Sequence, residues 1–470
     1  MTLKLHNTLT GTKDVFEPLR AGHAGMYTCG PTVWNYAHVG NLRAFLVYDL
    51  IRRQLQVSGY EVTHVMNLTD IDDRILDQAM HARVTIGEFV KPYVAAFFED
   101  MAALRAQPAT HYPRATEHIP EMVEMITGLI ENQNAYVADG DVYFRIASFP
   151  AYGALSHLDR GGLRPGVRVA TDKYDKESVS DFALWKHAHP EDEKLGAAWD
   201  APFGRGRPGW HIECSAMSKR YLGPTLDIHA GGVDLMFPHH ENEIAQSEAA
   251  NHKQLARFWL HSEHLSDATG EKMSKSAGGF TTLRDLRDAG HDPVAVRFFL
   301  LASAHYRTRL RLSGEALHAA AEQVRRLREF AERVRRSVPG EQDDSTFLKR
   351  IDEVRAGYRE ALDDDLNLPQ GIGLVFELVR EANAALDAGR VGERGREDLL
   401  RLIEEYDAHL DVVRSEEPGL AQEVERLIAD REAARKSRDF SRADQIREEL
   451  RDKGIVLEDS KEGVRWRRVR

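Results

Sequence analysis

The sequence is poor in cysteine, with only Cys29 and Cys214 among its 470 residues. A small secreted scaffold held by disulfides needs many more cysteines, so this class is excluded and a reducing compartment is expected. The chain also lacks any apolar run near the roughly 20 residues that cross a membrane. Its first residues have neither the basic start nor the apolar block of a signal peptide. We therefore expect a cytoplasmic protein without membrane spans.

Positive charge is also in deficit, because the formal net charge is −12 at pH 7. A surface of this sign does not attract nucleic acid indiscriminately, although a local basic face can still bind it. Two arginine clusters, at residues 325–336 and 465–470, are candidates for such a face. The second contains Trp466, on which a base can stack. The alternative for either cluster is an ordinary solvated surface.

The first 120 residues alternate short apolar runs with helical patterns, as a parallel α/β sheet does. Strands are predicted at residues 22–29 and 59–67, with a helix at 41–57 between them. Cys29 therefore lies at the carboxyl end of a strand, where open α/β sheets bind ligands.

Residues 121–200 interrupt this rhythm and indicate an insertion. They contain a predicted hairpin at 138–141 and a stretch at 161–169 that is rich in glycine, proline and arginine. A further strand is predicted at 225–229, and the pattern is mostly helical from about residue 292. The expected fold class is α/β, with a Rossmann-like parallel-sheet domain split by an insertion and followed by α-helical C-terminal domains.

Cys214 lies upstream of His239 and Glu243, which stand four residues apart. After Pro238, a favoured first-turn residue, this spacing puts both side chains on one face of a helix. Together with both thiols they are the side chains that zinc prefers. The alternatives are a disulfide and a pair of buried core thiols, since free cysteine is among the most buried residue types.

Two further motifs suit phosphate chemistry. The run His38-Val39-Gly40-Asn41 comes directly before the predicted helix, and a glycine there lets backbone and imidazole approach a phosphate. Far downstream, residues 270–276 place Lys272 and Lys275 three apart beside glycine. Two cations in one loop suit a polyphosphate leaving group that gains charge in the transition state. Each motif alone is weak, and a solvated lysine loop is the alternative for the second.

Together these two motifs resemble the paired signature of class I aminoacyl-tRNA synthetases. The fourth position of the first motif is often histidine in that class; Asn41 keeps a hydrogen-bond donor there but not a possible positive charge. Within the class, the chain resembles the cysteinyl-tRNA synthetase family over nearly its full length. The stretches that carry this resemblance are residues 26–41, 67–73, 206–217, 234–243 and 439–447.

The resemblance implies a role for individual residues. The implied zinc ligands are Cys29, Cys214, His239 and Glu243, whereas His240 is expected to be structural or to support a ligand. The implied catalytic residues are His38, Asn41, Lys272 and Lys275. ATP is expected to contact His38, Asn41, Asp227, His229, Gly231, Gly232 and Lys275. The cysteine substrate is expected to contact Gly30, Thr32, Thr69, Trp210 and Asp234.

The implied reaction is the activation of L-cysteine with ATP, followed by transfer of cysteine to the 3′-terminal ribose of tRNA(Cys). Magnesium is expected with ATP, and the protein is expected to be a monomer. Zinc would select the substrate thiol, because a hydrophobic pocket separates near-isosteres by only roughly 10 to 200-fold. A thiolate on zinc makes a bond of about 2.3 Å that a serine hydroxyl does not match at neutral pH.

The resemblance also implies a division of the chain. The expected domains are 1–120 and 201–262 for the two halves of the catalytic domain, 121–200 for the connective insertion, 263–312 for a stem-contact region with the lysine loop, 313–405 for a helical bundle, and 406–470 for an anticodon-binding domain.

Two other functions stay open. One is a cysteine ligase of the mycothiol type, which passes the same adenylate to an amino sugar. The other is a catalytically inactive paralogue that binds tRNA. The long helical C-terminal region and its terminal arginines favour a tRNA acceptor, while the retained lysines and ligand candidates favour an active enzyme.

Overall fold

The computed structural model describes residues 2–158, 163–169, 179–266, 281–413, 426–431, 434–435, 439–452, 455–460 and 463–468. The chain forms two compact units, Met1–Val412 and Val413–Arg470. Lys272 and Lys275 lie outside the described residues. No described helix combines the length and the apolar character that a membrane crossing requires.

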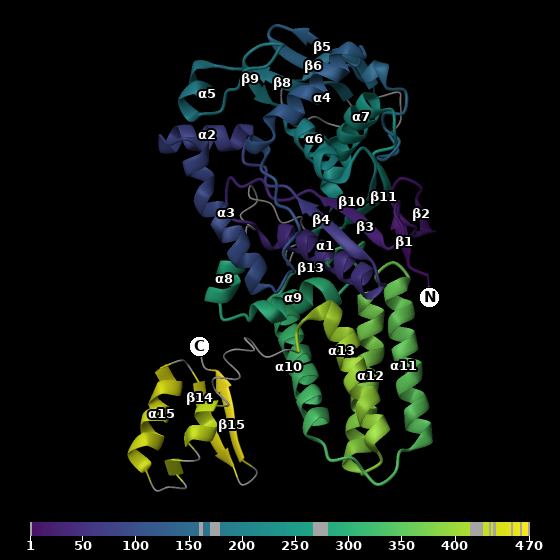
Figure 1. Ribbon diagram of the computed structural model, residues 1–470, viewed down its shortest axis with the longest axis vertical. Helices are drawn as coiled ribbons and strands as arrows, with labels where there is room; N and C mark the ends of the chain where they lie inside the picture. Colours follow the sequence, from purple (N-terminus) through teal and green to yellow (C-terminus); the bar gives the residue numbers. More distant parts are fainter. Residues whose placement is uncertain are drawn as a thin grey trace. The chain divides into compact units, whose positions relative to one another are not determined.

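A parallel sheet of four strands lies at the centre of the first unit (Figure 1). Its strand order is β11-β10-β3-β4, so strands far apart in the sequence are neighbours. The predicted Rossmann-like parallel α/β arrangement is confirmed. The strands are β3 (His23–Thr28), β4 (Glu61–Met66), β10 (Leu226–Gly232) and β11 (Ala256–Ser262).

The helix predicted after the first strand is α1 (Val39–Val57), which runs from the carboxyl ends of the strands into the core. It is apolar over most of its length, with residues such as Leu42, Leu46 and Ile51 buried. Two helices follow β4, namely α2 (Asp73–Ala82) and α3 (Ile86–Ala103). α3 begins with a capping box in which Thr85 and Glu88 bond each other's backbone N–H groups.

A second sheet is inserted between β4 and β10. Its predicted hairpin is confirmed, because the turn residues Asp139 and Gly140 both have positive φ, as a two-residue hairpin turn requires. The sheet has the order β5-β6-β8-β7, with β9 paired to β8. Its strands are β5 (Ala135–Ala138), β6 (Asp141–Phe144), β7 (Leu163–Val169), β8 (Val179–His187) and β9 (Gly206–Pro208).

Helices flank this inserted sheet and return the chain to the central one. The first is α4 (Ile119–Glu131), and a short helix, α5 (Pro190–Leu195), lies between β8 and β9. After β9 the chain turns at Gly209 into α6 (Trp210–Leu222), which carries Cys214. α6 packs on α4, and β10 follows it. The insertion therefore ends directly at the helix that brings the second cysteine to the central sheet.

The remainder of the first unit is mostly helical, as predicted. In Figure 1, long helices stand side by side in the lower part of this unit. They are α10 (Gly314–Arg336), α11 (Ser345–Asp363), α12 (Leu368–Asp387) and α13 (Glu393–Leu410). The preceding short elements are β12 (Leu265–Ser266), α8 (Leu283–Asp288), α9 (Pro293–Ala302) and β13 (Leu310–Arg311).

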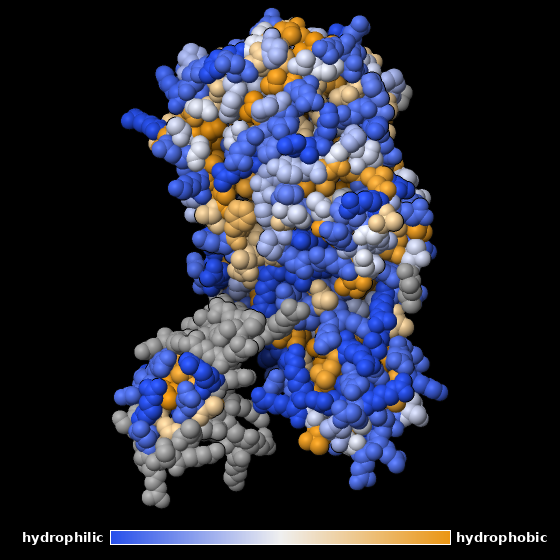
Figure 2. All heavy atoms as spheres, viewed as in Figure 1, coloured by the Kyte–Doolittle hydropathy of each residue, from blue (hydrophilic) through white to orange (hydrophobic). Residues whose placement is uncertain are grey.

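The arginine cluster at 325–336 lies on α10 and is largely paired with carboxylates. Arg325 bonds Glu322 at 2.7 Å and Glu329 at 2.6 Å, and Arg336 pairs with Glu332. In Figure 2 the visible face of α10–α13 is predominantly hydrophilic. The solvated alternative therefore describes this cluster better than a bare basic face.

The second unit contains α15 (Phe440–Asp452) and an antiparallel hairpin of β14 (Ile455–Ser460) and β15 (Gly463–Arg468). A mostly helical pattern was expected to the end, and the hairpin is an element that it did not predict. Trp466 pairs with Leu457 in this ladder. Ile455, Val456 and Val464 are β-branched, and such residues favour a pleated strand over a helix.

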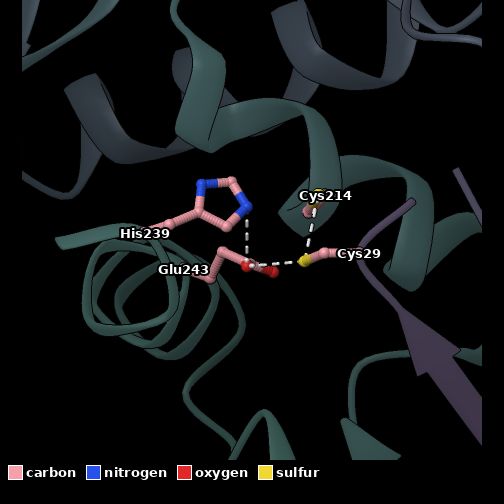
Figure 3. Close-up of side chains that lie close together, drawn as sticks. All are labelled: Cys29, Cys214, His239 and Glu243. Carbon is pink, nitrogen blue, oxygen red and sulfur yellow. Dashed lines mark hydrogen bonds and ion pairs between the residues drawn. The ribbon is translucent and has the colours of Figure 1, made fainter. Parts of the chain in front are cut away.

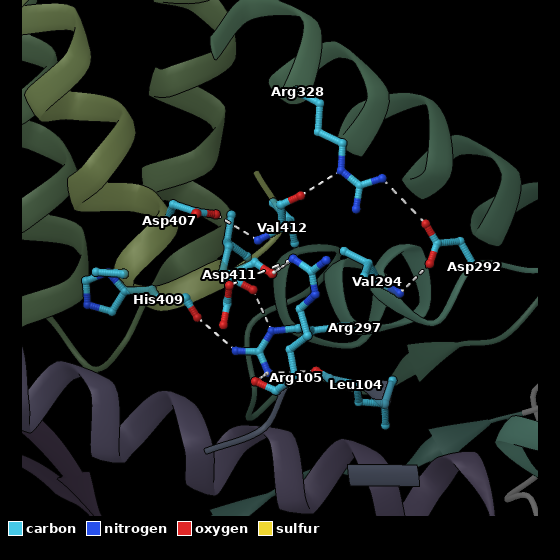
Figure 4. A network of polar contacts seen from close by, with 12 residues as sticks. Leu104, Arg105, Asp292, Val294, Arg297, Arg328, Asp407, His409, Asp411 and Val412 are labelled. Atoms are coloured by element: carbon cyan, nitrogen blue, oxygen red, sulfur yellow. Dashed lines mark hydrogen bonds and ion pairs between the residues drawn. The ribbon is translucent and has the colours of Figure 1, made fainter. Parts of the chain in front are cut away.

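A buried arginine joins α9 to three other parts of the first unit. Arg297 donates to Asp49 Oδ2 of α1 at 2.6 Å, to the Leu104 carbonyl after α3 at 3.1 Å, and to the His409 carbonyl of α13 at 3.0 Å. Figure 4 shows Arg297 between His409 and Leu104. Burial opposes ionisation of Asp49, but Arg297 and Arg53 together lower the pKa of this carboxyl below its ordinary value. The last carbonyls of α13, which lack helical partners, are bonded in this way.

We predict that Arg297→Met lowers the free energy of unfolding by about 3–5 kcal/mol, because it leaves buried carbonyls and part of the Asp49 charge without a donor. Urea unfolding followed by circular dichroism measures this. Arg325→Met, which removes two exposed ion pairs on α10, is the matched control and should unfold at the wild-type urea concentration. Equal midpoints for both variants would contradict this account of the junction.

Candidate active site

A cavity of about 620 Å³ lies at the carboxyl ends of the central strands. It is where an open α/β sheet is expected to bind ligands. Residues from the segments after β3, β4 and β10 and from α6 line it together. Among the predicted site residues, those that line the cavity are Cys29, Gly30, Thr32, His38, Asn41, Thr69, Trp210, Cys214, Gly232, Asp234 and His239.

His38 is the N-cap of α1. Its Nδ1 accepts a hydrogen bond from the Asn41 backbone N–H at 3.1 Å, and the Asn41 side-chain oxygen accepts from the His38 N–H at 3.4 Å. A neutral imidazole that accepts at Nδ1 carries its proton on Nε2. The capping box thus makes Nε2 of His38 a hydrogen-bond donor. Asn41 completes this box with a short amide, which suits an N3 position.

The residues on either side of the lysine motif lie beside the cavity. Before the motif, Leu265 of β12 lines the cavity. After it, the Thr281 carbonyl accepts a hydrogen bond of 2.9 Å from the Val39 N–H, and Thr282 forms an isolated antiparallel β-bridge with His38. Both flanks of residues 267–280 therefore lie close to the start of α1.

Two thiols, an imidazole and a carboxylate converge at one side of the cavity (Figure 3). Cys29 Sγ lies 3.9 Å from Cys214 Sγ and 3.7 Å from Glu243 Oε1. His239 Nε2 lies 3.1 Å from the same oxygen of Glu243. The donor atoms of all four residues lie within 4.8 Å of one another, so they can hold a metal ion. Both cysteines are free, and no disulfide joins them.

The helix expected after Pro238 is confirmed, with a π-helical first part. η5 (Met236–His240), which follows η4 (Val233–Leu235), contains His239 and continues directly into α7 (Glu241–Asn251), which contains Glu243. Phe237 has extended backbone angles inside η5. The expected approach of His239 to Glu243 nevertheless holds, because the chain is helical again from His239 onward.

Burial controls the protonation of this cluster. It raises the pKa of the Cys29 and Cys214 thiols, and the Cys29 pKa well above its ordinary value. It also lowers the pKa of His239 to about 3, so that the imidazole is neutral and has a lone pair for a metal. Buried thiols become thiolates when a cation lies close to them. The donor set therefore fits a metal ion.

Neighbouring side chains hold His239 in place. Its Nδ1 lies 2.9 Å from Nδ1 of His211, and its ring stacks on Trp210 with centroids 4.2 Å apart. These contacts turn Nε2 toward Glu243. A hydrogen bond on the second ring nitrogen is the usual support of a metal-ligating histidine.

A second set of donors overlaps the first, because Cys29 and Glu243 also lie near His229 and His240. His229 Nε2 bonds Glu243 Oε2 at 2.8 Å, and His240 Nδ1 lies 2.8 Å from His261 Nε2. Neither His229 nor His240 lines the cavity. A metal held by the first set is open to a substrate in the cavity, whereas these two histidines lie behind it.

Three residues expected at ATP do not line this cavity, namely Asp227, His229 and Gly231. Asp227 stands at the amino end of β10, where its Oδ2 accepts from the Gly25 N–H at 2.7 Å and its Oδ1 from the Leu19 N–H. Gly231 packs so tightly on His240 that an added Cβ would lie 2.4 Å from the ring. The reason is that β10 is buried along its length and only Gly232, at its end, reaches the cavity.

A hydrogen-bonded chain in the wall of the cavity was not predicted from the sequence. The Gly30 N–H donates to Asn67 Oδ1 at 2.9 Å, Asn67 Nδ2 donates to Thr69 Oγ1 at 3.0 Å, and Thr69 Oγ1 donates to Glu213 Oε2 at 3.0 Å. Burial raises the pKa of Glu213 well above its ordinary value. The hydroxyl proton of Thr69 is used on Glu213, so toward a ligand this oxygen acts as an acceptor. Asn67 and Glu213 each lie in a stretch that resembles the family, and this resemblance was the only indication in the sequence that they belong to the site.

Comparison with known proteins defines the class. A family model described as tRNA synthetases class I (C) catalytic domain matches residues 15–322. Methionyl-tRNA synthetase of Mycobacterium tuberculosis in complex with methionyl-adenylate shares the fold, with a TM-score of 0.59 and 16% identity over 83% of this chain and 89% of that one. The LeuRS of Agrobacterium radiobacter K84 gives 0.61 and 12% over 86% of each chain. The fold and the match to the family model define a class I aminoacyl-tRNA synthetase.

The family follows from closer relatives. Cysteine–tRNA ligase of Leptospira interrogans serovar Lai is 44% identical over 99% of both chains, and that of Solibacter usitatus is 45% identical over 100% of both. A DALR domain matches residues 357–410, and a cysteinyl-tRNA ligase anticodon binding domain matches residues 417–467. The chain belongs to the cysteinyl-tRNA synthetase family.

Proposed function

We propose that this chain joins L-cysteine to tRNA(Cys) through a cysteinyl-adenylate, in the cavity described above. The observation that carries the proposal is that the His38 motif borders the same cavity as Cys29, Cys214 and His239, whose donor atoms cluster with that of Glu243. The full-length similarity to cysteine–tRNA ligases supports the same substrates. We further expect a monomer in the cytoplasm.

The first step is attack of a cysteine carboxylate oxygen on the α-phosphorus of ATP, which breaks the bond to the β-phosphate oxygen and releases pyrophosphate. His38 donates from Nε2 to the transferring phosphate, and Asn41 holds its ring. Lys272 and Lys275 stabilise the pyrophosphate, and magnesium accompanies ATP. Positioning and charge stabilisation suffice for such a transfer.

The second step transfers the acyl group. A hydroxyl of the terminal ribose attacks the carbonyl carbon of the adenylate, its proton passes to a phosphate oxygen of the adenylate, and AMP leaves with the bonding electron pair. Thr69 and Asp234 supply oxygen acceptors for the substrate ammonium, with Gly30, Thr32 and Trp210 around it. The chain from Gly30 to Glu213 fixes the Thr69 hydroxyl before substrate arrives, which is the preorganisation that catalysis needs.

The metal that we propose for the cluster is zinc. Tetrahedral zinc ligands at about 2.0–2.3 Å from the ion lie about 3.3–3.8 Å from each other. The observed separations of 3.9, 3.7 and 3.1 Å are close to these values. When bound, zinc would expand its coordination to take a substrate thiolate, which it binds far better than a hydroxyl. Cys29, Cys214, the neutral His239 and Glu243 would supply its ligands.

Aminoacylation tests the function directly. A tRNA(Cys) transcript with labelled cysteine, ATP and magnesium should become charged. Charging of an amino sugar instead of tRNA would favour the mycothiol-type ligase. Absence of cysteine-dependent exchange between pyrophosphate and ATP, with zinc present, would favour the inactive paralogue.

For the metal, we predict about one zinc per chain in freshly purified protein. Cys214→Ser should lose zinc and cysteine binding, because Cys214 belongs only to the first donor set. His229→Gln, which removes a ligand candidate of the second set only and keeps an amide donor for Glu243, is the matched variant and should keep the metal. Elemental analysis and calorimetric titration with cysteine measure both. Zinc lost in His229→Gln but kept in Cys214→Ser would contradict this assignment and place the metal in the second set.

For the phosphate motif, we predict that Gly40→Ala slows pyrophosphate exchange by about 100-fold, since small misplacements of catalytic groups have effects of this size. An added Cβ would lie 2.9 Å from Cε1 and Nδ1 of His38 and must displace the ring. Cysteine affinity should not change. Gly87→Ala is the control, because no atom lies within 4 Å of a Cβ at that helical glycine. Similar rates for both variants would remove His38 from the mechanism.

A further inference from the structure

The edge of the cavity carries two aromatic rings that are each paired with an arginine. The guanidinium carbon of Arg74 lies 5.4 Å from the centroid of Trp34, and that of Arg284 lies 5.1 Å from the centroid of Tyr36. Trp34 and Tyr36 both line the cavity and belong to the segment between β3 and α1. The proposed chemistry of the two small substrates uses neither ring.

The aromatic surface continues away from the cavity along α3. Tyr36 is 39% exposed and meets Tyr93 edge-to-face at 5.4 Å, and Tyr93 contacts Phe89 at 5.4 Å. Tyr93 and Phe89 do not line the cavity. We call Trp34, Tyr36, Tyr93 and Phe89 the aromatic rim. Figure 2 shows hydrophobic residues gathered on the side of the molecule where α3 lies.

Carboxylates hold the two arginines in place. Arg74 makes two hydrogen bonds to Asp72, at 2.8 Å and 3.0 Å, and Arg284 bonds Glu99 at 2.8 Å. These pairs orient the guanidinium planes and offset much of their charge. A surface of fixed arginines and aromatic rings is suited to stacking on bases more than to holding bare phosphates.

We propose that the aromatic rim stacks the unpaired nucleotides at the 3′ end of tRNA and guides the terminal ribose into the cavity. This proposal rests on the function proposed above. An unpaired RNA end is recognised mainly by stacking on aromatic and arginine side chains. The rim extends beyond the cavity, as a polynucleotide entering from outside requires, whereas ATP and cysteine are used inside it. Adenine of ATP is the rival occupant.

The test compares two assays on Tyr36→Ala and Tyr93→Ala. Pyrophosphate exchange needs only cysteine and ATP, and aminoacylation also needs tRNA. We expect KM for tRNA to rise about tenfold in each variant, the size expected for loss of one stacked base. Exchange should stay within about twofold of wild type. Tyr36→Phe, which keeps the ring, should restore the tRNA KM.

The matched control is Phe98→Ala, an exposed aromatic on α3 that meets Tyr112 edge-to-face at 4.9 Å and does not line the cavity. It should leave the tRNA KM unchanged. The proposal is overturned if Tyr36→Ala leaves the tRNA KM at its wild-type value, or if it raises KM for ATP in exchange, which would assign the ring to adenine. Failure of the proposed function itself shows differently, as absent exchange in the wild-type protein.

Discussion

The site depends on the pairing of β3 with β10 in the parallel sheet. This contact is formed by residues such as Met26 and Ile228, and it is extended by the hydrogen bond from the Cys29 N–H to the Ala230 carbonyl. It brings together two thiols that lie 185 residues apart in the sequence. Because the entropy of loop closure grows only slowly with length, a whole inserted sheet between these strands costs the pairing little. The cluster therefore exists only in the folded sheet.

Burial gives this cluster its chemistry. The same exclusion of water that lowers the pKa of His239 and His211 to about 3 raises those of both thiols. A cation placed among them lies in a low dielectric, where its attraction to the thiolates is stronger than in water. α1 links this region to the rest of the unit, since His38 caps it at the cavity and Asp49 bonds Arg297 at the junction with α13. α1 therefore fixes the position of the His38 ring relative to the cavity and to the junction with α13.

Much of the fold and of the cavity lining could be predicted from the sequence, because periodicity marks the parallel strands and dense motifs mark the four metal-ligand candidates. Hydrogen bonds between side chains that are far apart in the sequence could not be predicted. Thr69 and Glu213 are separated by 144 residues, and no local pattern reports their hydrogen bond. Asp227 stands in a motif-rich stretch, yet it lies at the amino end of its strand and bonds backbone. The arginines of α10 were a candidate basic face because the sequence does not show that carboxylates such as Glu322 and Glu329 pair with them.

The central claim is that the protein's two thiols hold a zinc that recognises a third thiol, on the substrate. X-ray absorption at the zinc edge, recorded with and without cysteine, measures the number of sulfur neighbours directly. The account predicts two sulfur atoms at about 2.3 Å in the free protein, three when cysteine is added, and two when serine is added. An unchanged sulfur count on saturation with cysteine would contradict it.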